Sequence, residues 1–157
     1  MSNSVNQTMT ITKRDGRREA IDLNKIVAAV GRCAIGLSEI DPMRVALKTI
    51  GGLFDGATTQ ELDQLSIRTS AALTSEEPEY GRLAARLLAE FIEKEVANQG
   101  IHSFSQSIVL GVEQGVFNER LGSFVAQHAR KLNSAIHLPF NNLFEYFGLR
   151  TDRKSVV

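Results

Sequence analysis

The sequence predicts an α+β protein that is mainly α, in which a small N-terminal β-hairpin caps a four-helix bundle and further helices follow. Apolar and polar residues alternate on both sides of Asp15-Gly16, as they do in a hairpin. After Asp22 the apolar period changes from two residues to about 3.6, which is the helical period. Helix-start signals then recur along the chain. These three observations define the fold class.

The predicted hairpin has Asp15-Gly16 at its tip. Asp-Gly is favoured in two-residue turns because a type I′ turn needs positive φ at both central positions. Cross-strand partners then have residue numbers that sum to 31, so that Arg14 faces Arg17 and Lys13 faces Arg18. Like charges directly opposite each other destabilise an antiparallel pair. Either these cations extend into water, or they bind an anion.

Four helices are predicted to form the bundle, each with a recognisable start. Asp22 is expected to cap the first helix, and Asp41-Pro42 is expected to open the second. Thr58 and Glu61 fit a capping box for the third helix, and the acids near residues 76–79 suit the dipole at the start of the fourth. The expected helix ends are Gly36, about Phe54 and Asn98-Gln99-Gly100, and the expected inward-facing residues of the second to fourth helices are Met43, Ala46, Leu47, Ile50, Leu62, Leu65, Thr69, Ala72, Tyr80, Leu83, Ala84, Leu87, Phe91 and Ile92.

The chain is expected to divide into a first domain and a second helical segment. Residues 1–8 are polar and are expected to be disordered, whereas residues 9–100 contain the hairpin and the four helices. Residues 101–150 form the second segment, and residues 151–157 form a tail. The apolar stripes expected in the second segment are Phe104, Ile108, Val112 and Val116, followed by Leu121, Phe124, Val125 and Leu132 after the helix cap Asn118.

Composition and motifs exclude several classes of function. The formal net charge of +0 argues against a generic nucleic-acid binder, which is usually basic over a whole face. The chain lacks a signal core and an apolar run of membrane length, so we expect a cytoplasmic protein without a membrane partner. The single cysteine, Cys33, is expected to be a small core hydrophobe rather than a nucleophile. His102, His128 and His137 lack metal spacing, and no P-loop, G-x-S-x-G or H-E-x-x-H motif occurs.

Several residues that could lie near the hairpin suit a polyphosphate. Lys25 lies on the first turn of the helix that follows the hairpin, near the free N–H groups of that helix. Thr59 offers a hydroxyl at another helix start, and Lys94 on the fourth helix can close over the same end of the bundle. Lysines, an arginine, a helix N-terminus and a hydroxyl together form a set that binds phosphate groups.

Two carboxylates, Glu19 and Asp22, accompany these cations. Carboxylates beside phosphates make sense if they accept hydrogen bonds from an adenine amino group, a ribose hydroxyl or the water ligands of a metal. The alternative is that the cations simply extend into water around a surface hairpin, where solvent screens their repulsion.

Three stretches support the first interpretation: "ITKRDGRREAIDLNKI" (residues 11–26), "FDGATTQEL" (54–62) and "PEYGRLAARLLAEFIEK" (78–94). In this order they resemble the ATP-cone, the regulatory nucleotide-binding module found mainly at the N-terminus of ribonucleotide reductase large subunits. The later stretches "FSQSIVLGVEQGVFNERL" and "FEYFGLRT" are similar to the helical segment that leads into the reductase catalytic domain. The resemblance makes residues 9–100 an ATP-cone domain and residues 101–150 that leading segment. It favours a reductase over the cone-bearing transcriptional repressor, whose four-cysteine zinc ribbon is absent.

The resemblance also implies an effector site in this chain. The matching residues are Ile11 near the base, Lys13, Arg14, Lys25, Thr59 and Lys94 on the phosphates, and Glu19 and Asp22 on the base or sugar side. Arg17 and Arg18 match variable tip positions, which we expect to be solvated. Asp22 stands where many relatives have asparagine, and Asp63 stands where some have histidine.

The function implied by the resemblance is allosteric control of ribonucleoside-diphosphate reductase, and hence of deoxyribonucleotide synthesis for DNA replication. ATP, bound with Mg²⁺, would keep the enzyme active, and dATP would inhibit it. The nucleotides would act by changing how large subunits associate with each other and with the radical-generating small subunit. Two alternatives remain: a stand-alone helical interaction module or cone-type regulator without reductase activity, and a phosphotransfer enzyme, which the missing P-loop disfavours.

We predict that this chain alone does not reduce ribonucleotides. The family's catalysis uses cysteines in a large α/β barrel and near the C-terminus, whereas this chain has Cys33 alone and looks truncated before the barrel. The measurement is the conversion of a ribonucleoside diphosphate to its deoxy form by the purified protein, with a small subunit and a dithiol reductant added. Deoxy product above a blank without the chain would contradict the prediction.

Overall fold

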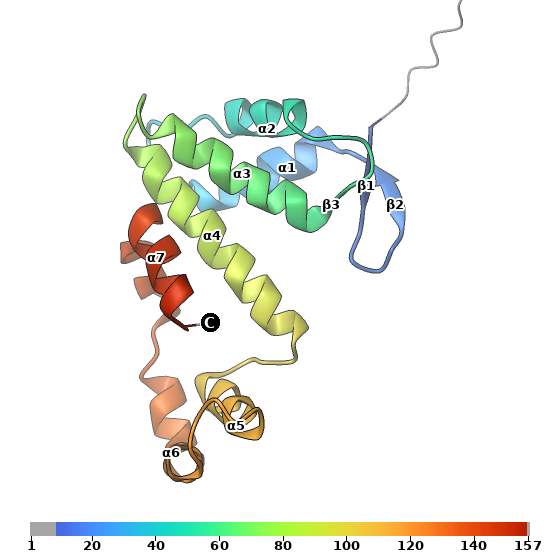
Figure 1. Cartoon of the computed structure of the whole chain (residues 1–157). Helices are drawn as coiled ribbons and strands as arrows, with labels where there is room; N and C mark the ends of the chain where they lie inside the picture. Colours follow the sequence, from blue (N-terminus) through green and yellow to red (C-terminus); the bar gives the residue numbers. More distant parts are fainter. Residues whose placement is uncertain (1–8, 157) are drawn as a thin grey trace, which may run out of the picture. The chain divides into compact units, whose positions relative to one another are not determined.

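The computed structural model describes the backbone of residues 9–156 and the side chains of residues 9–137 and 139–151 (Figure 1). The expectation for residues 1–8 lies outside the described residues. The predicted fold class is confirmed, because the chain is mainly helical with a small sheet. The elements are β1 (Thr10–Thr12), β2 (Arg18–Ala20), α1 (Leu23–Cys33), α2 (Pro42–Gly51), β3 (Ala57–Thr58), α3 (Thr59–Leu73), α4 (Glu79–Asn98), α5 (Phe104–Glu113), α6 (Glu119–Ser134), the 3-10 helix η1 (Leu138–Leu143) and α7 (Tyr146–Val156).

The described residues form two compact units. The first unit comprises residues 9–89 and 144–156, and therefore contains the sheet, α1 to α3, the first part of α4, and α7. The second unit comprises residues 90–143, with the last part of α4, then α5, α6 and η1. Helix α4 is thus the one helix that contributes residues to both units.

The hairpin forms, but its register differs by one residue from the prediction. Ile11 pairs with Glu19, and the flanking pairs follow the same register, so partner numbers sum to 30 rather than 31. The Gly16 N–H donates to the Lys13 carbonyl at 2.9 Å, and the Lys13 N–H donates to the Arg17 carbonyl at 2.8 Å. Gly16 has a φ of +82°. The loop therefore has three residues and ends in a left-handed glycine, the next commonest hairpin connection after the two-residue turn. The predicted oppositions between cations at positions 14 and 17, and at 13 and 18, are wrong.

A third strand, β3, was not predicted. It runs parallel to β1, with Ile11 opposite Ala57 and Thr12 opposite Thr58, so the strand order is β2-β1-β3 and β1 is central. A two-residue strand is too short to show alternation in the sequence. Figure 1 shows that α3 starts directly where β3 ends.

The core of the first unit confirms some predicted inward-facing residues and corrects others. Val45 and Ala46 of α2 are fully buried, whereas Met43 and Leu47 are 40% and 54% exposed. On α3 the fully buried residues are Ser66, Ile67, Ser70 and Leu73. Of the predicted residues, Leu62 packs against the core while partly buried, Leu65 and Thr69 are partly buried, and Ala72 is exposed. On α4 the prediction holds for Tyr80, Leu83, Ala84 and Phe91.

Small hydroxyl side chains explain the correction. The buried Thr49, Ser66 and Ser70 each donate to the carbonyl one turn earlier, at 2.8 to 3.0 Å. A buried hydroxyl that finds a partner within its own helix costs little. Small side chains also let helix backbones approach each other, and α2 packs against α3 here. A pattern of apolar residues alone cannot reveal a helix face of this kind.

The predicted helix starts are confirmed. The Asp22, Asp41 and Asn118 side chains cap α1, α2 and α6, and Thr58 and Glu61 form the predicted capping box. Helix α1 ends earlier than predicted, at Cys33, where the Arg86 guanidinium from α4 donates to the Cys33 carbonyl at 2.9 Å. A long-range donor therefore satisfies this helix end.

The second unit is a helical hairpin in which α5 packs against α6. Ile108 and Val125 are buried as predicted. The remaining expectations for this stripe are partly wrong: Phe104, Val116, Leu121 and Phe124 are between 36% and 68% exposed. Helices α5 and α6 bury only the sides that face each other. Within this unit, apolar residues on their other sides therefore stay exposed.

Leu83→Ala is expected to lower the free energy of unfolding by about 2–5 kcal/mol, because the buried side chain leaves a cavity. The matched control is Leu47→Ala, which removes the same atoms from a half-exposed residue and should cost about 0.5 kcal/mol or less. Urea midpoints at a constant m-value measure both changes. Equal losses would show that Leu47 faces the core, as its sequence pattern predicts.

Candidate functional site

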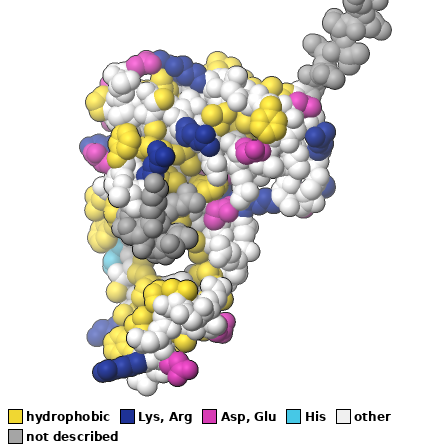
Figure 2. Space-filling model, viewed as in Figure 1, with side chains coloured by type: hydrophobic (Ala, Val, Ile, Leu, Met, Phe, Trp, Pro, Cys, Tyr) yellow, Lys and Arg dark blue, Asp and Glu magenta, His cyan; other side chains and the backbone are white. Residues whose placement is uncertain are grey.

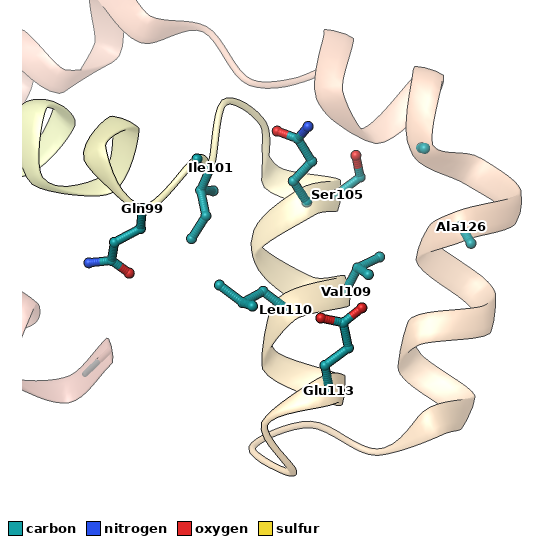
Figure 3. Close-up of a pocket in the computed structure, with 10 residues that line it drawn as sticks. Gln99, Ile101, Ser105, Val109, Leu110, Glu113 and Ala126 are labelled. Carbon is teal, nitrogen blue, oxygen red and sulfur yellow. The ribbon is translucent and has the colours of Figure 1, made fainter.

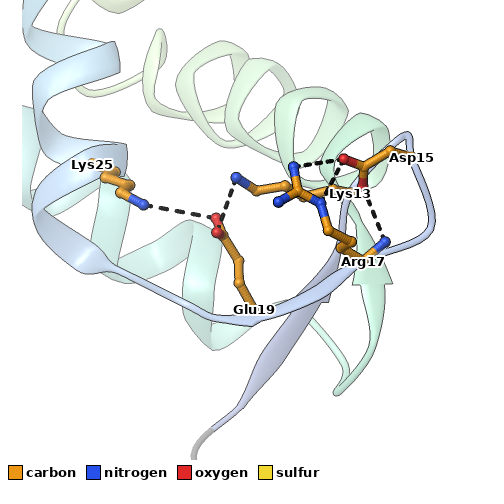
Figure 4. Close-up of polar contacts among 5 residues, drawn as sticks. All are labelled: Lys13, Asp15, Arg17, Glu19 and Lys25. Carbon is orange, nitrogen blue, oxygen red and sulfur yellow. Dashed lines mark hydrogen bonds and ion pairs between the residues drawn. The ribbon is translucent and has the colours of Figure 1, made fainter.

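Two lysines converge on one carboxylate beside the hairpin. Figure 4 shows Lys13 from the end of β1 and Lys25 from the first turn of α1, both pointing toward Glu19 of β2. The Lys13 ammonium lies 2.9 Å from Glu19 Oε2, and the Lys25 ammonium lies 3.8 Å from Glu19 Oε1. Register explains the first contact: Glu19 faces Ile11, and Lys13 is two residues along the same strand face.

The lysines keep Glu19 ionised. The hydrogen bond from Lys13 and the charges of Lys13, Lys25 and Arg17 hold the pKa of the Glu19 carboxyl below its ordinary value. At neutral pH the two lysines are therefore paired with an anion, the Glu19 carboxylate. A phosphate that binds both lysines must displace this carboxylate, and about a third of the Glu19 side chain is exposed to solvent for such an exchange.

Two helix starts adjoin these lysines. The Asp22 carboxylate caps α1 by accepting a hydrogen bond from the Asn24 N–H at 2.9 Å. Lys25 lies in the first turn after this cap. Thr59 is the first residue of α3, and the residue before it, Thr58, pairs with Thr12 in the β1–β3 ladder. Because neighbouring strands lie about 4.8 Å apart, this register puts the start of α3 beside Lys13. Helix N-termini favour anions.

The remaining predicted site residues lie in different surroundings. Ile11 is 7% exposed and is one of the buried hydrophobic residues. Arg14 lies in the exposed hairpin loop. Lys94 lies on α4 in the second unit, where its ammonium is 3.5 Å from the Glu90 carboxylate. The first unit therefore contributes every predicted site residue except Lys94.

The two tip arginines differ from each other. Arg17 forms a local pair with Asp15, with Nη2 to Oδ2 at 2.7 Å (Figure 4), and its hydrogen bonds lower the pKa of that carboxyl. Arg18 is exposed, but its guanidinium lies against Gly56 in the loop before β3, so near that a Cβ there would be 2.5 Å from Nη2. Sequence analysis missed this contact, because no local pattern joins β2 to that loop.

The second unit contains a pocket of about 320 Å³ between α5, α6 and the end of α4 (Figure 3). Its walls are mainly apolar, from Ile101, Val109, Leu110 and Ala126, and Glu113 is the only charged lining residue. A pocket whose one charge is negative does not suit a polyphosphate.

Within the part of the chain that the structure describes, no three His, Cys, Asp or Glu side chains gather as metal ligands would. His128 is exposed on α6, and its ring lies 4.7 Å from the Phe124 ring. No helix in residues 9–156 is long and apolar enough to span a bilayer. On the face in Figure 2, cationic and acidic side chains are scattered among apolar and uncharged ones.

The hairpin, the α1 start and the α3 start thus define a class: a small α+β module in which two lysines lie near two helix starts. Residues 9–95 match the ATP cone domain. The chain is 33% identical to the ribonucleoside-diphosphate reductase large subunit of Caenorhabditis elegans, over 94% of this chain and 20% of that protein. The large subunit of Arabidopsis thaliana is 32% identical over 95% and 19%, and large chain 2 of Saccharomyces cerevisiae is 31% identical over 95% and 18%.

Because the family match covers more than half of the sequence, the chain belongs to the ATP cone domain family. It spans about a fifth of the length of the relatives it matches. The family and these relatives support an allosteric nucleotide-binding region.

Lys13→Gln is expected to raise the pKa of the Glu19 carboxyl toward its ordinary value, because the Lys13 hydrogen bond is the largest cause of the lowered pKa. The matched control, Lys25→Gln, should raise it less, since Lys25 lies farther away and acts through its charge. NMR of the Glu19 carboxyl carbon against pH measures both.

The sign of the pH dependence follows from the lowered pKa. The pairing of Glu19 with Lys13 contributes to stability above the pKa of the unfolded chain, and the contribution is lost as pH falls through the lowered pKa of the folded state. A larger rise for Lys25→Gln than for Lys13→Gln would contradict the geometry.

Proposed function

We propose that this chain binds ATP and dATP as alternative allosteric effectors at the site formed by the hairpin and the starts of α1 and α3. The observation that carries the proposal is the convergence of Lys13 and Lys25 on Glu19 beside the start of α3, in a chain of the ATP cone family. Two ammonium groups that share one exchangeable carboxylate form a site that a phosphate chain can enter.

In the bound state, phosphate oxygens replace the Glu19 carboxylate on Lys13 and Lys25. Thr59 adds a hydroxyl, and the start of α3 adds the positive end of its dipole. Arg14, in the exposed hairpin loop, adds a further phosphate contact. Mg²⁺ accompanies the triphosphate, because this ion usually binds through substrate phosphate oxygens and water rather than in a dedicated protein cage.

The carboxylates act on the nucleoside end. Glu19, released from the lysines, and Asp22, exposed at the start of α1, accept from base or sugar donors. Ile11 packs near the base. ATP and dATP differ only in the ribose 2′-hydroxyl, so their different effects depend on a contact at the sugar.

In a full-length relative, this binding controls deoxyribonucleotide synthesis. We propose that ATP supports reductase activity and that dATP inhibits it, by favouring different associations of large subunits with each other and with the small subunit. Such control requires each nucleotide to bind the two assemblies with different affinities, since equal affinities shift no equilibrium.

A nucleotide-blind interaction module is the second candidate. The observation that favours it is the exposure of apolar side chains on the second unit, such as Val116 at 68% and Phe124 at 53%. Single exposed apolar residues are common on protein surfaces, so this observation weighs less than the site and the family match.

Calorimetry is expected to show binding of both ATP and dATP. Lys13→Ala should weaken binding by about 1.5–3 kcal/mol, or roughly ten- to a hundredfold, the scale of a hydrogen bond to a charged group. Arg17→Ala is the matched control and should change affinity little, because its guanidinium pairs with Asp15 at the tip.

Three results would contradict this prediction. Absence of binding at millimolar nucleotide would favour the interaction module. Equal losses for Lys13→Ala and Arg17→Ala would mean that the cations act only as a diffuse field. Time-dependent hydrolysis of ATP would revive the phosphotransfer enzyme.

A further inference from the structure

The loop before β3 is fastened to β1 by side chains as well as by strand pairing. Asp55 Oδ1 accepts from the Thr10 N–H at 2.7 Å and from the Thr10 hydroxyl at 2.8 Å. The Gly56 N–H donates to the Thr10 carbonyl at 2.8 Å, and the Thr12 hydroxyl donates to the Gly56 carbonyl at 2.9 Å. We call Thr10, Thr12, Asp55 and Gly56, with these four hydrogen bonds, the clip.

Arg18 covers the clip from the other strand of the hairpin. Its guanidinium lies against Gly56, whose φ of +81° is a conformation that favours glycine. The two hydrogen bonds from Thr10 and the charge of Arg18 hold the pKa of the Asp55 carboxyl below its ordinary value. Asp55 is therefore ionised at neutral pH, and both of its bonds to Thr10 are charge-assisted.

The clip sets the position of Thr59. Strand β3 has only two residues, and a pairing of that length specifies register weakly. Thr59 follows directly, as the first residue of α3. The four hydrogen bonds of the clip lie within three residues of β3 and add to this weak pairing. They therefore help to fix where the start of α3 lies beside Lys13.

We propose that Asp55 is a positioning residue of the nucleotide site, which holds Thr59 and the start of α3 in register with Lys13. The proposal rests on the proposed function and adds a residue that acts through Thr59 rather than by touching the nucleotide. Holding both walls of the site in place before binding removes an ordering cost from association.

The sign of the effect separates this role from simple electrostatics. An aspartate near a phosphate site repels the ligand, so electrostatics alone predicts that removal of its charge strengthens ATP binding. Positioning predicts the opposite: Asp55→Ala weakens ATP binding about tenfold, the size of one misplaced hydrogen bond. The control Asp15→Ala removes the same charge from the hairpin tip, where the carboxylate pairs with Arg17, and should not weaken binding.

The test is a double-mutant cycle by calorimetry with ATP. Asp55→Ala and Thr59→Ala should each weaken binding, and the double variant should lose little more than either single variant, because Asp55 acts through Thr59. Thr10→Val removes the hydroxyl that donates to Asp55 and keeps the side-chain shape. If Asp55→Ala folds poorly, Thr10→Val takes its place in the cycle with Thr59→Ala. Thr10→Ser, which retains the hydroxyl, should restore affinity.

Each outcome decides the proposal. Coupling between positions 55 and 59, with rescue by Thr10→Ser, supports it. Unchanged or stronger ATP binding in Asp55→Ala and Thr10→Val, or fully additive losses in the cycle, would overturn the positioning role while leaving the proposed function intact. Absence of ATP binding by the unaltered chain would overturn both.

Discussion

Strand β1 is hydrogen-bonded along both of its edges, and the rest of the first unit depends on this constraint. One edge is paired with β2, a local partner that the hairpin loop supplies. The other edge is paired with β3 and with Asp55, 45 residues farther along the chain than Thr10. Buried backbone groups need partners, so the central strand can complete its hydrogen bonds only when the start of α3 lies beside the hairpin. The candidate site occupies that junction.

Charge around the hairpin is arranged in pairs that can exchange. Lys13 and Lys25 share Glu19, Arg17 holds Asp15, and each of these pairs is exposed to solvent. Exposed ion pairs contribute little to stability, so an incoming phosphate can replace a carboxylate without a large loss of folding energy. A buried pair would resist such an exchange, because breaking it leaves an uncompensated charge. Solvent-exposed pairs are therefore suited to a reversible effector site.

The helices provide a rigid base for this exchangeable surface. Leu83 and Val45 are fully buried, and the hydroxyls of Thr49, Ser66 and Ser70 are satisfied within their own helices. Arg86 donates from α4 to the carbonyls of Cys33 and Ile35 at the end of α1. Lys25 lies at the other end of α1, so its helix is held in place by hydrogen bonds from α4 to its last turn. A site is most selective when its side chains project from elements held in this way.

The sequence by itself determined the features that depend on neighbours in the chain. The caps at Asp22, Asp41 and Thr58 could be predicted because each bonds to a backbone group two or three residues away. The three ATP-cone stretches likewise identified the family, and the site residues that they imply remain a prediction. Only the tertiary structure decided the hairpin register, the pairing of β3 and the burial of small hydroxyl residues. The hairpin register depends on the competition among alternative turns. The other features, like the Arg18 and Asp55 contacts, depend on groups that meet only after folding. A local sequence pattern contains no information on either.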